Sequence, residues 1–158
     1  MAKLSKFNDD AALKKISRYC AFRERCEHEV REKLAQMNVF GSQADKLISK
    51  LREEDFLNDE RYLRSFVLGK FNQNSWGRNR IHHELTMRGF KDHIASQALA
   101  EIPEEAYEMT LDKLAKEKFS SRREEDLFEK RGKVAAYLIR KGFEPDLVWS
   151  RLKELFKG

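Results

Sequence analysis

The chain has 158 residues, of which 37% are charged and 41% hydrophobic, with only two prolines, and this composition favours exposed helices over sheets. No apolar run approaches the roughly 20 residues that span a membrane, and the first ten residues lack the apolar core of a signal peptide. Two cysteines are too few for a disulfide framework. We therefore expect a soluble, intracellular protein.

The first part of the chain predicts a three-helix unit over residues 11–57. Residues 1–10 show no clear period, so we expect a flexible lead there. The first helix of the unit is expected over about residues 11–22, where apolar residues gather on one side.

Two further helices complete this first unit. One is expected to begin near Cys26, with Val30 and Leu34 on its buried face. The other is expected after a turn at Gly41, with Ser42 to Asp45 as its S-x-x-D cap.

The rest of the chain predicts two further units, residues 58–102 and 103–158. Asn58 is expected to cap the second unit, and Pro103 to open the third in a first-turn position. Within these units we expect Asp92 to cap a helix, Ser121 to Glu124 to form a capping box, and Pro145 to start the last helix.

One segment, Trp76 to Ile102, reads as helix, tight turn and helix, with Gly89 as the left-handed turn residue. The same apolar spacing returns when the segment is shifted back by 51 residues, which places Asn38 at the turn, and forward by 53, which places Gly142 there. Asn is the other residue that tolerates positive φ. We therefore predict an all-α fold of three tandem three-helix repeats that form an elongated, curved array.

Positive charge is concentrated in the middle of the chain. The whole chain has a net charge of +5, whereas the segment from Arg61 to Lys91 holds seven bases and one acid, Glu84, which gives 7 − 1 = +6. Residues 103–158 are nearly balanced, with 13 bases and 12 acids. This distribution predicts a surface that faces a polyanion. The predicted binding residues for DNA or another polyanionic partner are Arg61, Arg64, Lys70, Trp76, Arg78, Arg80, Arg88 and Lys91.

Each of these residues also has a structural interpretation. Any one arginine can belong to a solvated helix surface. Arg78 and Arg80 lie near a predicted helix N-terminus, which itself attracts phosphate. Trp76 can stack on an exposed base or close the helix start as a hydrophobic staple. Trp149 is expected in the core or between repeats.

Residues that would support catalysis are sparse. The run His82-His83-Glu84 lacks the H-E-x-x-H spacing of a zinc site, and His28 with Glu32 supplies only two ligands on one face. No glycine-rich phosphate loop is present, so ATP chemistry would belong to a partner. We predict that the protein is not an enzyme and that it binds no metal and no cofactor. Whether Cys20 and Cys26 have a redox role stays open.

Several short motifs in the chain match a known pattern: Asn58-Asp59-Glu60-Arg61-Tyr62, Phe66-Val67, Gly77-Arg78-Asn79-Arg80-Ile81, Glu84-Leu85 and Arg88-Gly89-Phe90, with related patterns at Glu29-Val30, Lys33-Leu34 and Lys141-Gly142-Phe143. In these motifs the chain resembles the RecX family of bacterial RecA regulators. The resemblance implies tandem three-helix repeats, binding to RecA filaments and DNA, and inhibition of recombinase, ATPase and coprotease activity in the bacterial cytoplasm. Cys26 stands where the family pattern has a capping Ser, and Asn38 stands where it has the turn glycine.

The sequence is compatible with two functional hypotheses. A filament regulator predicts a monomer that binds single- and double-stranded DNA weakly and with little sequence preference. A helix-turn-helix transcription factor predicts a dimer and a palindromic target.

Overall fold

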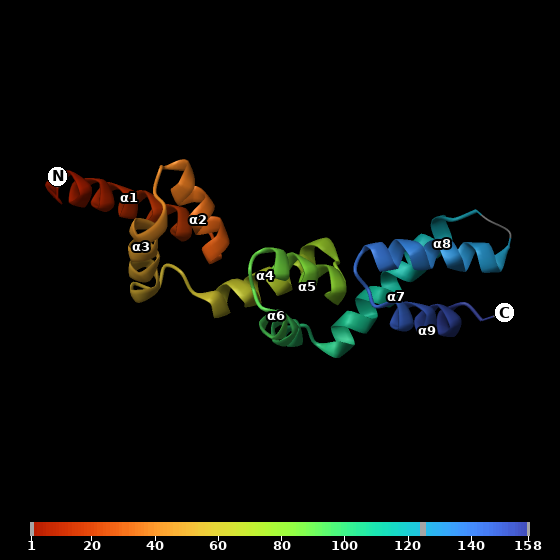
Figure 1. Cartoon of the computed structure of the whole chain (residues 1–158). Coiled ribbons are helices and arrows are strands. Elements are labelled where there is room, and N and C mark those ends of the chain that lie inside the picture. Colours follow the sequence, from red (N-terminus) through yellow and green to blue (C-terminus); the bar gives the residue numbers. More distant parts are fainter. Residues whose placement is uncertain (1, 124–125, 158) are drawn as a thin grey trace. The chain divides into compact units, whose positions relative to one another are not determined.

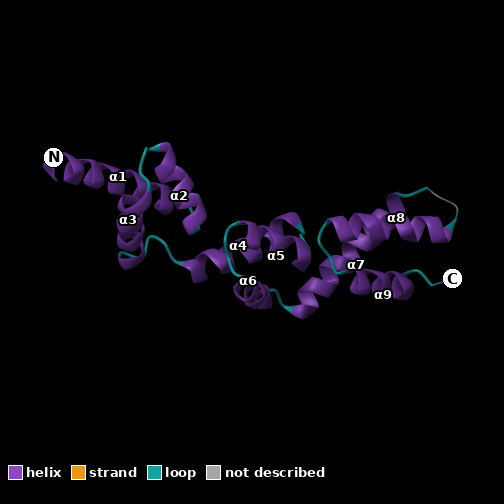
Figure 2. Ribbon diagram, in the orientation of Figure 1, coloured by secondary structure: helices purple, strands orange, loops and turns teal. Residues whose placement is uncertain are grey.

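The computed structural model describes residues 2–123 and 126–157, with side chains from residue 9 onward. Every regular element in these ranges is helical (Figure 2). The elements are α1 (Ala2–Phe22), α2 (Glu27–Gln36), α3 (Gly41–Glu53), α4 (Asp59–Asn74), α5 (Arg78–Met87), α6 (Asp92–Ala98), the short η1 (Leu99–Glu101), α7 (Glu104–Ser121), α8 (Leu127–Arg140) and α9 (Pro145–Leu155). The predicted all-α class is confirmed. None of the described helices is both long and apolar enough to cross a membrane.

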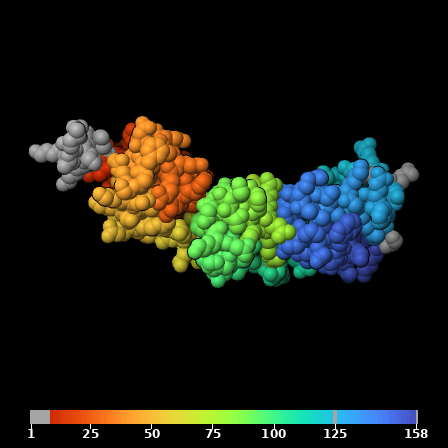
Figure 3. Space-filling model, viewed as in Figure 1, coloured from red at the N-terminus to blue at the C-terminus, as the bar shows by residue number. Residues whose placement is uncertain are grey.

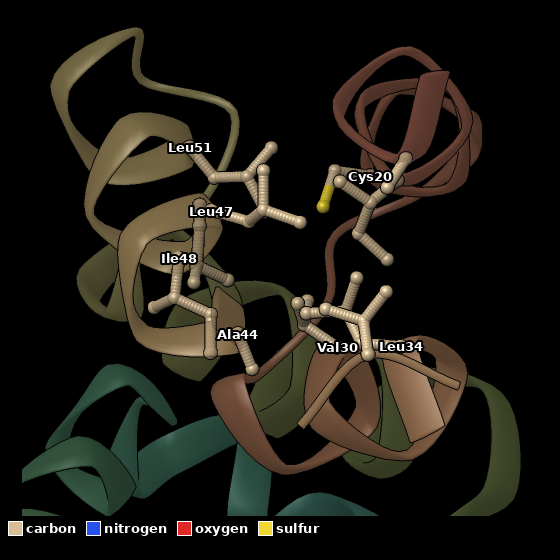
Figure 4. Packing of buried hydrophobic residues seen from close by; sticks show 11 residues of the cluster. Cys20, Val30, Leu34, Ala44, Leu47, Ile48 and Leu51 are labelled. Atoms are coloured by element: carbon tan, nitrogen blue, oxygen red, sulfur yellow. The ribbon is translucent and has the colours of Figure 1, made fainter. Parts of the chain in front are cut away.

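The chain packs as two compact units, residues 1–65 and 66–158, and their boundary falls within α4. In the first unit α1, α2 and α3 enclose one apolar core, to which each helix contributes at helical spacing. Figure 4 shows this core from close by. Its fully buried members include Ile16, Val30, Leu34 and Leu51, and burial of each such side chain contributes roughly 1.5–3 kcal/mol.

The second unit contains two helical triplets joined by aromatic contacts. Helices α7, α8 and α9 pack against one another, as do α5 and α6 (Figure 1). Tyr107 of α7 is the central aromatic residue, because its ring centroid lies 5.9 Å from that of Phe71 on α4 and 5.2 Å from that of Phe143 after α8. All three rings are buried, so these contacts link the second and third triplets.

The turn after the second helix of each triplet has the same backbone conformation. Asn38, Gly89 and Gly142 have φ values of 61°, 90° and 104°. In each turn the next residue donates a backbone hydrogen bond to the carbonyl five residues earlier. These bonds run from Val39 to Leu34 (2.8 Å), from Phe90 to Leu85 (3.2 Å) and from Phe143 to Leu138 (3.1 Å). The predicted three-helix repeat is confirmed, with Asn38 occupying the glycine position.

Helix starts agree with the sequence prediction in part. Asn58 caps α4 by accepting the Arg61 backbone N–H at 3.0 Å, and Pro145 is the first residue of α9, as predicted. Helix α1 begins at Ala2 rather than near residue 11. The S-x-x-D cap is wrong, because α3 begins at Gly41 and Ser42 lies inside its first turn.

Two further caps differ from the prediction. Asp92 is the first helical residue of α6 rather than its cap, which is Lys91. Ser121 is the last residue of α7, so it cannot cap the next helix, and Glu124 lies outside the described residues. Asp126 caps α8 instead, because its carboxylate accepts the Phe128 N–H at 3.0 Å.

Candidate nucleic-acid interface

Arg61, near the start of α4, is held by carboxylates of the first unit. Its guanidinium lies 2.9 Å from Glu24 and 2.8 Å from the Asp55 carboxylate, and it also donates to the Asp55 carbonyl. The hydrogen bond to Glu24 raises the pKa of Arg61, with Asp55 adding to it. The charge of Arg61 is therefore largely neutralised within the chain.

Arg78, the first residue of α5, connects the second and third repeats. Its guanidinium lies 2.9 Å from Glu144 and 2.8 Å from Glu104, and its central carbon lies 3.8 Å from the centre of the Tyr107 ring. Burial opposes its charge, yet the two carboxylates raise its pKa. The Tyr107 hydroxyl in turn donates to Glu144 and accepts the Arg78 backbone N–H at 3.0 Å.

Arg88 is also paired, whereas two other predicted residues are exposed. Arg88, at the end of α5, lies 2.7 Å from Glu84, and its guanidinium lies 4.7 Å from the centre of the Phe66 ring. The hydrogen bond from Arg88 lowers the pKa of Glu84. Arg64 is exposed on α4 and Lys91 is exposed at the start of α6.

Two cations, Lys70 and Arg80, lie over the Trp76 ring, and a third, Lys141, lies in the turn whose backbone bonds to the start of α5. We call Lys70, Trp76, Arg80 and Lys141 the Trp76 cluster. The Arg80 guanidinium lies 4.0 Å from the centre of the indole, and the Lys70 ammonium lies 4.9 Å from it. Lys141 donates to the Asn74 carbonyl at 2.7 Å. Burial and, to a smaller extent, the charge of Arg80 lower the pKa of Lys141.

The backbone brings this cluster together by a close crossing of two glycines. Gly77 donates to the Lys141 carbonyl at 2.8 Å, and Asn79 donates to the Gly142 carbonyl at 2.9 Å. A Cβ on Gly77 would lie 2.2 Å from the Gly142 carbonyl carbon, and a Cβ on Gly142 would lie 2.4 Å from that of Arg80. Only residues without a side chain fit this contact. In Figure 3 the second and third repeats accordingly form one continuous surface.

The start of α5 therefore cannot act as the anion site that the sequence suggested. Gly77, Arg78 and Asn79 donate their N–H groups to Lys141, Tyr107 and Gly142, which satisfies the positive end of the helix internally. The charge count along the sequence also missed the acids that reach the arginines from outside the segment. The sequence did not predict that Lys141 belongs to this cluster. Its only signal in the sequence is a glycine in each of the two segments that cross, Gly77 and Gly142.

The structure also shows where the remaining candidate residues lie. Trp149 on α9 is 39% exposed, so it does not lie in the core, and its expected alternative position between repeats stays a prediction. Among the described residues no group of three His, Cys, Asp or Glu side chains is placed to hold a metal ion. Cys20 and Cys26 are buried and unpaired thiols, and burial raises the pKa of each.

Comparisons with known proteins identify a family that shares this arrangement of helices. The family model for the second three-helix domain of RecX matches residues 58–99, and that for the third matches residues 105–151. The chain belongs to the RecX family. The "Regulatory protein RecX" of Bacillus cytotoxicus is 31% identical over 145 residues, which cover 92% of this chain and 53% of that protein. That of Clostridium perfringens is 30% identical over 131 residues, covering 82% and 61%. The chain thus spans between half and two thirds of the length of these curated RecX relatives.

Solved structures support the RecX fold over nearly the whole chain. A crystal structure of regulatory protein RecX aligns with a TM-score of 0.86 at 23% identity, covering 97% of this chain and 75% of the other. RecX from Lactobacillus salivarius aligns with a TM-score of 0.83 at 26% identity, covering 98% of both chains. The triplets that contain residues 58–99 and 105–151 are therefore RecX repeats.

Proposed function

We propose that this chain is a non-enzymatic regulator that binds RecA filaments on DNA and inhibits their recombinase, ATPase and coprotease activity. Membership of the RecX family supports the choice of RecA. The observation that carries the proposal is the Trp76 cluster, because its three cations face no carboxylate close enough for an ion pair among the described residues. Such a surface suits a polyanion.

The proposed mode of action follows from tandem repetition. Three similar units, with boundaries near residues 57 and 102, would present a series of related surfaces to a filament whose sites also repeat. The protein would act as a monomer in the bacterial cytoplasm, and weak, sequence-tolerant binding to single- and double-stranded DNA would assist it. Any ATP chemistry belongs to RecA.

Titration of the pure protein onto RecA filaments on single-stranded DNA tests this function. ATP hydrolysis and strand exchange should both decline as the protein is added, and RecA omitted from the mixture should leave no ATPase activity. Unchanged ATP hydrolysis and strand exchange at saturating protein would contradict the proposal.

A charge-reversal variant tests the role of the basic surface. Arg78 and Arg88 are held in ion pairs, so reversing them would also disturb the fold. Lys70→Glu with Arg80→Glu avoids those pairs, changes the charge by four units and keeps residues that favour helices. Inhibition should weaken, most clearly at low salt. The matched control, Lys113→Glu with Lys116→Glu on the exposed side of α7, should inhibit like the parent.

The alternative of a helix-turn-helix transcription factor is tested in the same preparation. It rests on the helix–turn–helix formed by α5 and α6 around Gly89. It predicts a dimer in solution and strong preference for one palindromic sequence. A monomer with uniform affinity for unrelated DNA sequences contradicts it.

A further inference from the structure

The Trp76 cluster is assembled from three separate segments of the second unit. Lys70 lies on α4, Arg80 on α5 and Lys141 in the turn between α8 and α9. A left-handed residue at Ser75, with φ of 54°, ends α4 and folds Trp76 back so that its N–H bonds to the Lys70 carbonyl at 3.1 Å. The third cation therefore comes from the next repeat, brought in by the glycine crossing.

The positive charge of this cluster is not balanced within the described chain. None of Lys70, Arg80 and Lys141 forms an ion pair with a described carboxylate. The acid that Arg80 influences, Glu84, is itself paired with Arg88 at 2.7 Å. Neighbouring cations repel one another, and an external anion would relieve this repulsion.

The indole in this cluster is poorly placed to read a base. The Arg80 guanidinium stacks 4.0 Å from the ring centre, so it covers a face on which a base would stack. A stacked guanidinium keeps its N–H edge directed outward, where it can donate two hydrogen bonds to the oxygens of one phosphate. The cluster thus offers phosphate contacts, while Arg80 occupies one face of the indole.

Resting on the proposed function, we propose that the Trp76 cluster is a binding site for the phosphodiester backbone of DNA that two repeats build jointly. The ligand is a nucleic-acid backbone because its charges recur along the strand, so that one strand can neutralise all three cations. Trp76 serves as the platform that orients Arg80. The site exists only while Gly77 and Gly142 cross, since that contact places Lys141.

Neutralising the three cations tests the ligand. Lys70→Gln, Arg80→Gln and Lys141→Gln together should weaken binding to a mixed-sequence single-stranded oligonucleotide, measured by fluorescence anisotropy, by about tenfold or more at low salt. The slope of log affinity against log salt should become shallower by about 2, because three contacts at about 0.7 each are lost. The control Lys113→Gln, Lys116→Gln and Lys153→Gln removes equal charge from exposed positions of the same unit and should bind like the parent.

A glycine pair tests the joint construction without removing any charge. Gly142→Ala and Gly89→Ala place a side chain at equivalent turns, both with positive φ, so both carry similar backbone strain. An added Cβ at Gly89 has nothing within 4 Å, whereas at Gly142 it meets Arg80. Gly142→Ala should therefore lose DNA affinity several-fold, and Gly89→Ala should lose little. Each variant is checked first by its thermal melting curve, and Lys141→Gln alone reports on the third cation if Gly142→Ala unfolds.

The outcomes separate this inference from the proposed function. Parent-like DNA binding by the triple Gln variant overturns the site, even if RecA inhibition persists. If the variant binds DNA normally but loses binding to RecA without DNA, the ligand is an acidic protein surface and the inference is also overturned. If the parent does not inhibit RecA, the proposed function fails, while the DNA titrations still decide the site.

Discussion

The side chain of Arg78 lies between two carboxylates and an aromatic ring, and only 19% of it is exposed. Its contacts join α5 to the third repeat, so we expect it to stabilise the fold rather than to bind a partner. Arg78→Met keeps the apolar stem but leaves Glu144 and the Tyr107 ring without the guanidinium. We expect a loss of about 2 kcal/mol in the free energy of unfolding, as for a partly buried charged hydrogen bond.

Urea unfolding measures that loss, and Arg80→Met serves as its control. Arg80 is exposed and stacks on Trp76 without forming an ion pair within the described chain, so its replacement should change stability little. Equal stability of the parent and Arg78→Met would show that the ion pairs with Glu104 and Glu144 contribute nothing net.

The two thiols are expected to be unreactive in the folded protein. Burial raises the pKa of Cys20 to about 11 and also raises that of Cys26, so the reactive thiolate is scarce near neutral pH. Folding favours the neutral thiol of Cys20. Its contribution to stability is therefore fully present below pH 9, the ordinary value, and is lost as the pH rises towards 11.

Thiol labelling checks this at mildly alkaline pH. Both cysteines should react slowly in the folded chain and rapidly in denaturant. Fast labelling of either thiol without unfolding would point to an accessible, redox-competent cysteine instead.

At the scale of the helices, the sequence predicted the buried face of each helix, but it predicted the helix ends only in part. Apolar residues at helical spacing specify which face is buried, so the pattern predicts Val30 and Leu34 as core residues, and both are fully buried. Whether a side chain caps a helix depends on the backbone conformation of single residues at the helix start. Ser42 has the right chemistry, but Gly41 already starts α3 with φ of 54°, which places the serine inside the helix.

This difference gives a matched pair of substitutions. Asn58→Ala removes a cap whose oxygen accepts the Arg61 N–H at 3.0 Å, and it should cost about 1 kcal/mol. Ser42→Ala removes a hydroxyl from within the first turn of α3 and should be neutral or slightly stabilising, because alanine favours helix. Chemical denaturation of both variants measures the two changes. A larger loss for Ser42→Ala than for Asn58→Ala would contradict the assigned caps.

At the scale of the whole molecule, the repeats and the family could be predicted from the sequence, but the ion pairs of the basic residues could not. The three left-handed turns recur after 51 and 53 residues, so one pattern predicts them all. Charge is different, because the acids that neutralise the arginines come from distant segments: Glu24 and Asp55 for Arg61, Glu104 and Glu144 for Arg78. No count along a segment of sequence includes such partners.

The salt dependence of DNA binding distinguishes two hypotheses about which basic residues contact phosphate. If all seven bases between Arg61 and Lys91 contacted phosphate, log affinity for single-stranded DNA would fall against log salt with a slope of about −5. If only the three cations of the Trp76 cluster do so, the slope is about −2, and raising salt from about 50 to about 200 mM weakens binding roughly 16-fold rather than roughly 1,000-fold.

We expect the shallower slope, equal for unrelated sequences, because carboxylates already hold Arg61, Arg78 and Arg88. Anisotropy titrations at several salt concentrations measure it. A slope near −5 would mean that DNA displaces those carboxylates, and the ion pairs would then compete with binding rather than simply stabilise the fold.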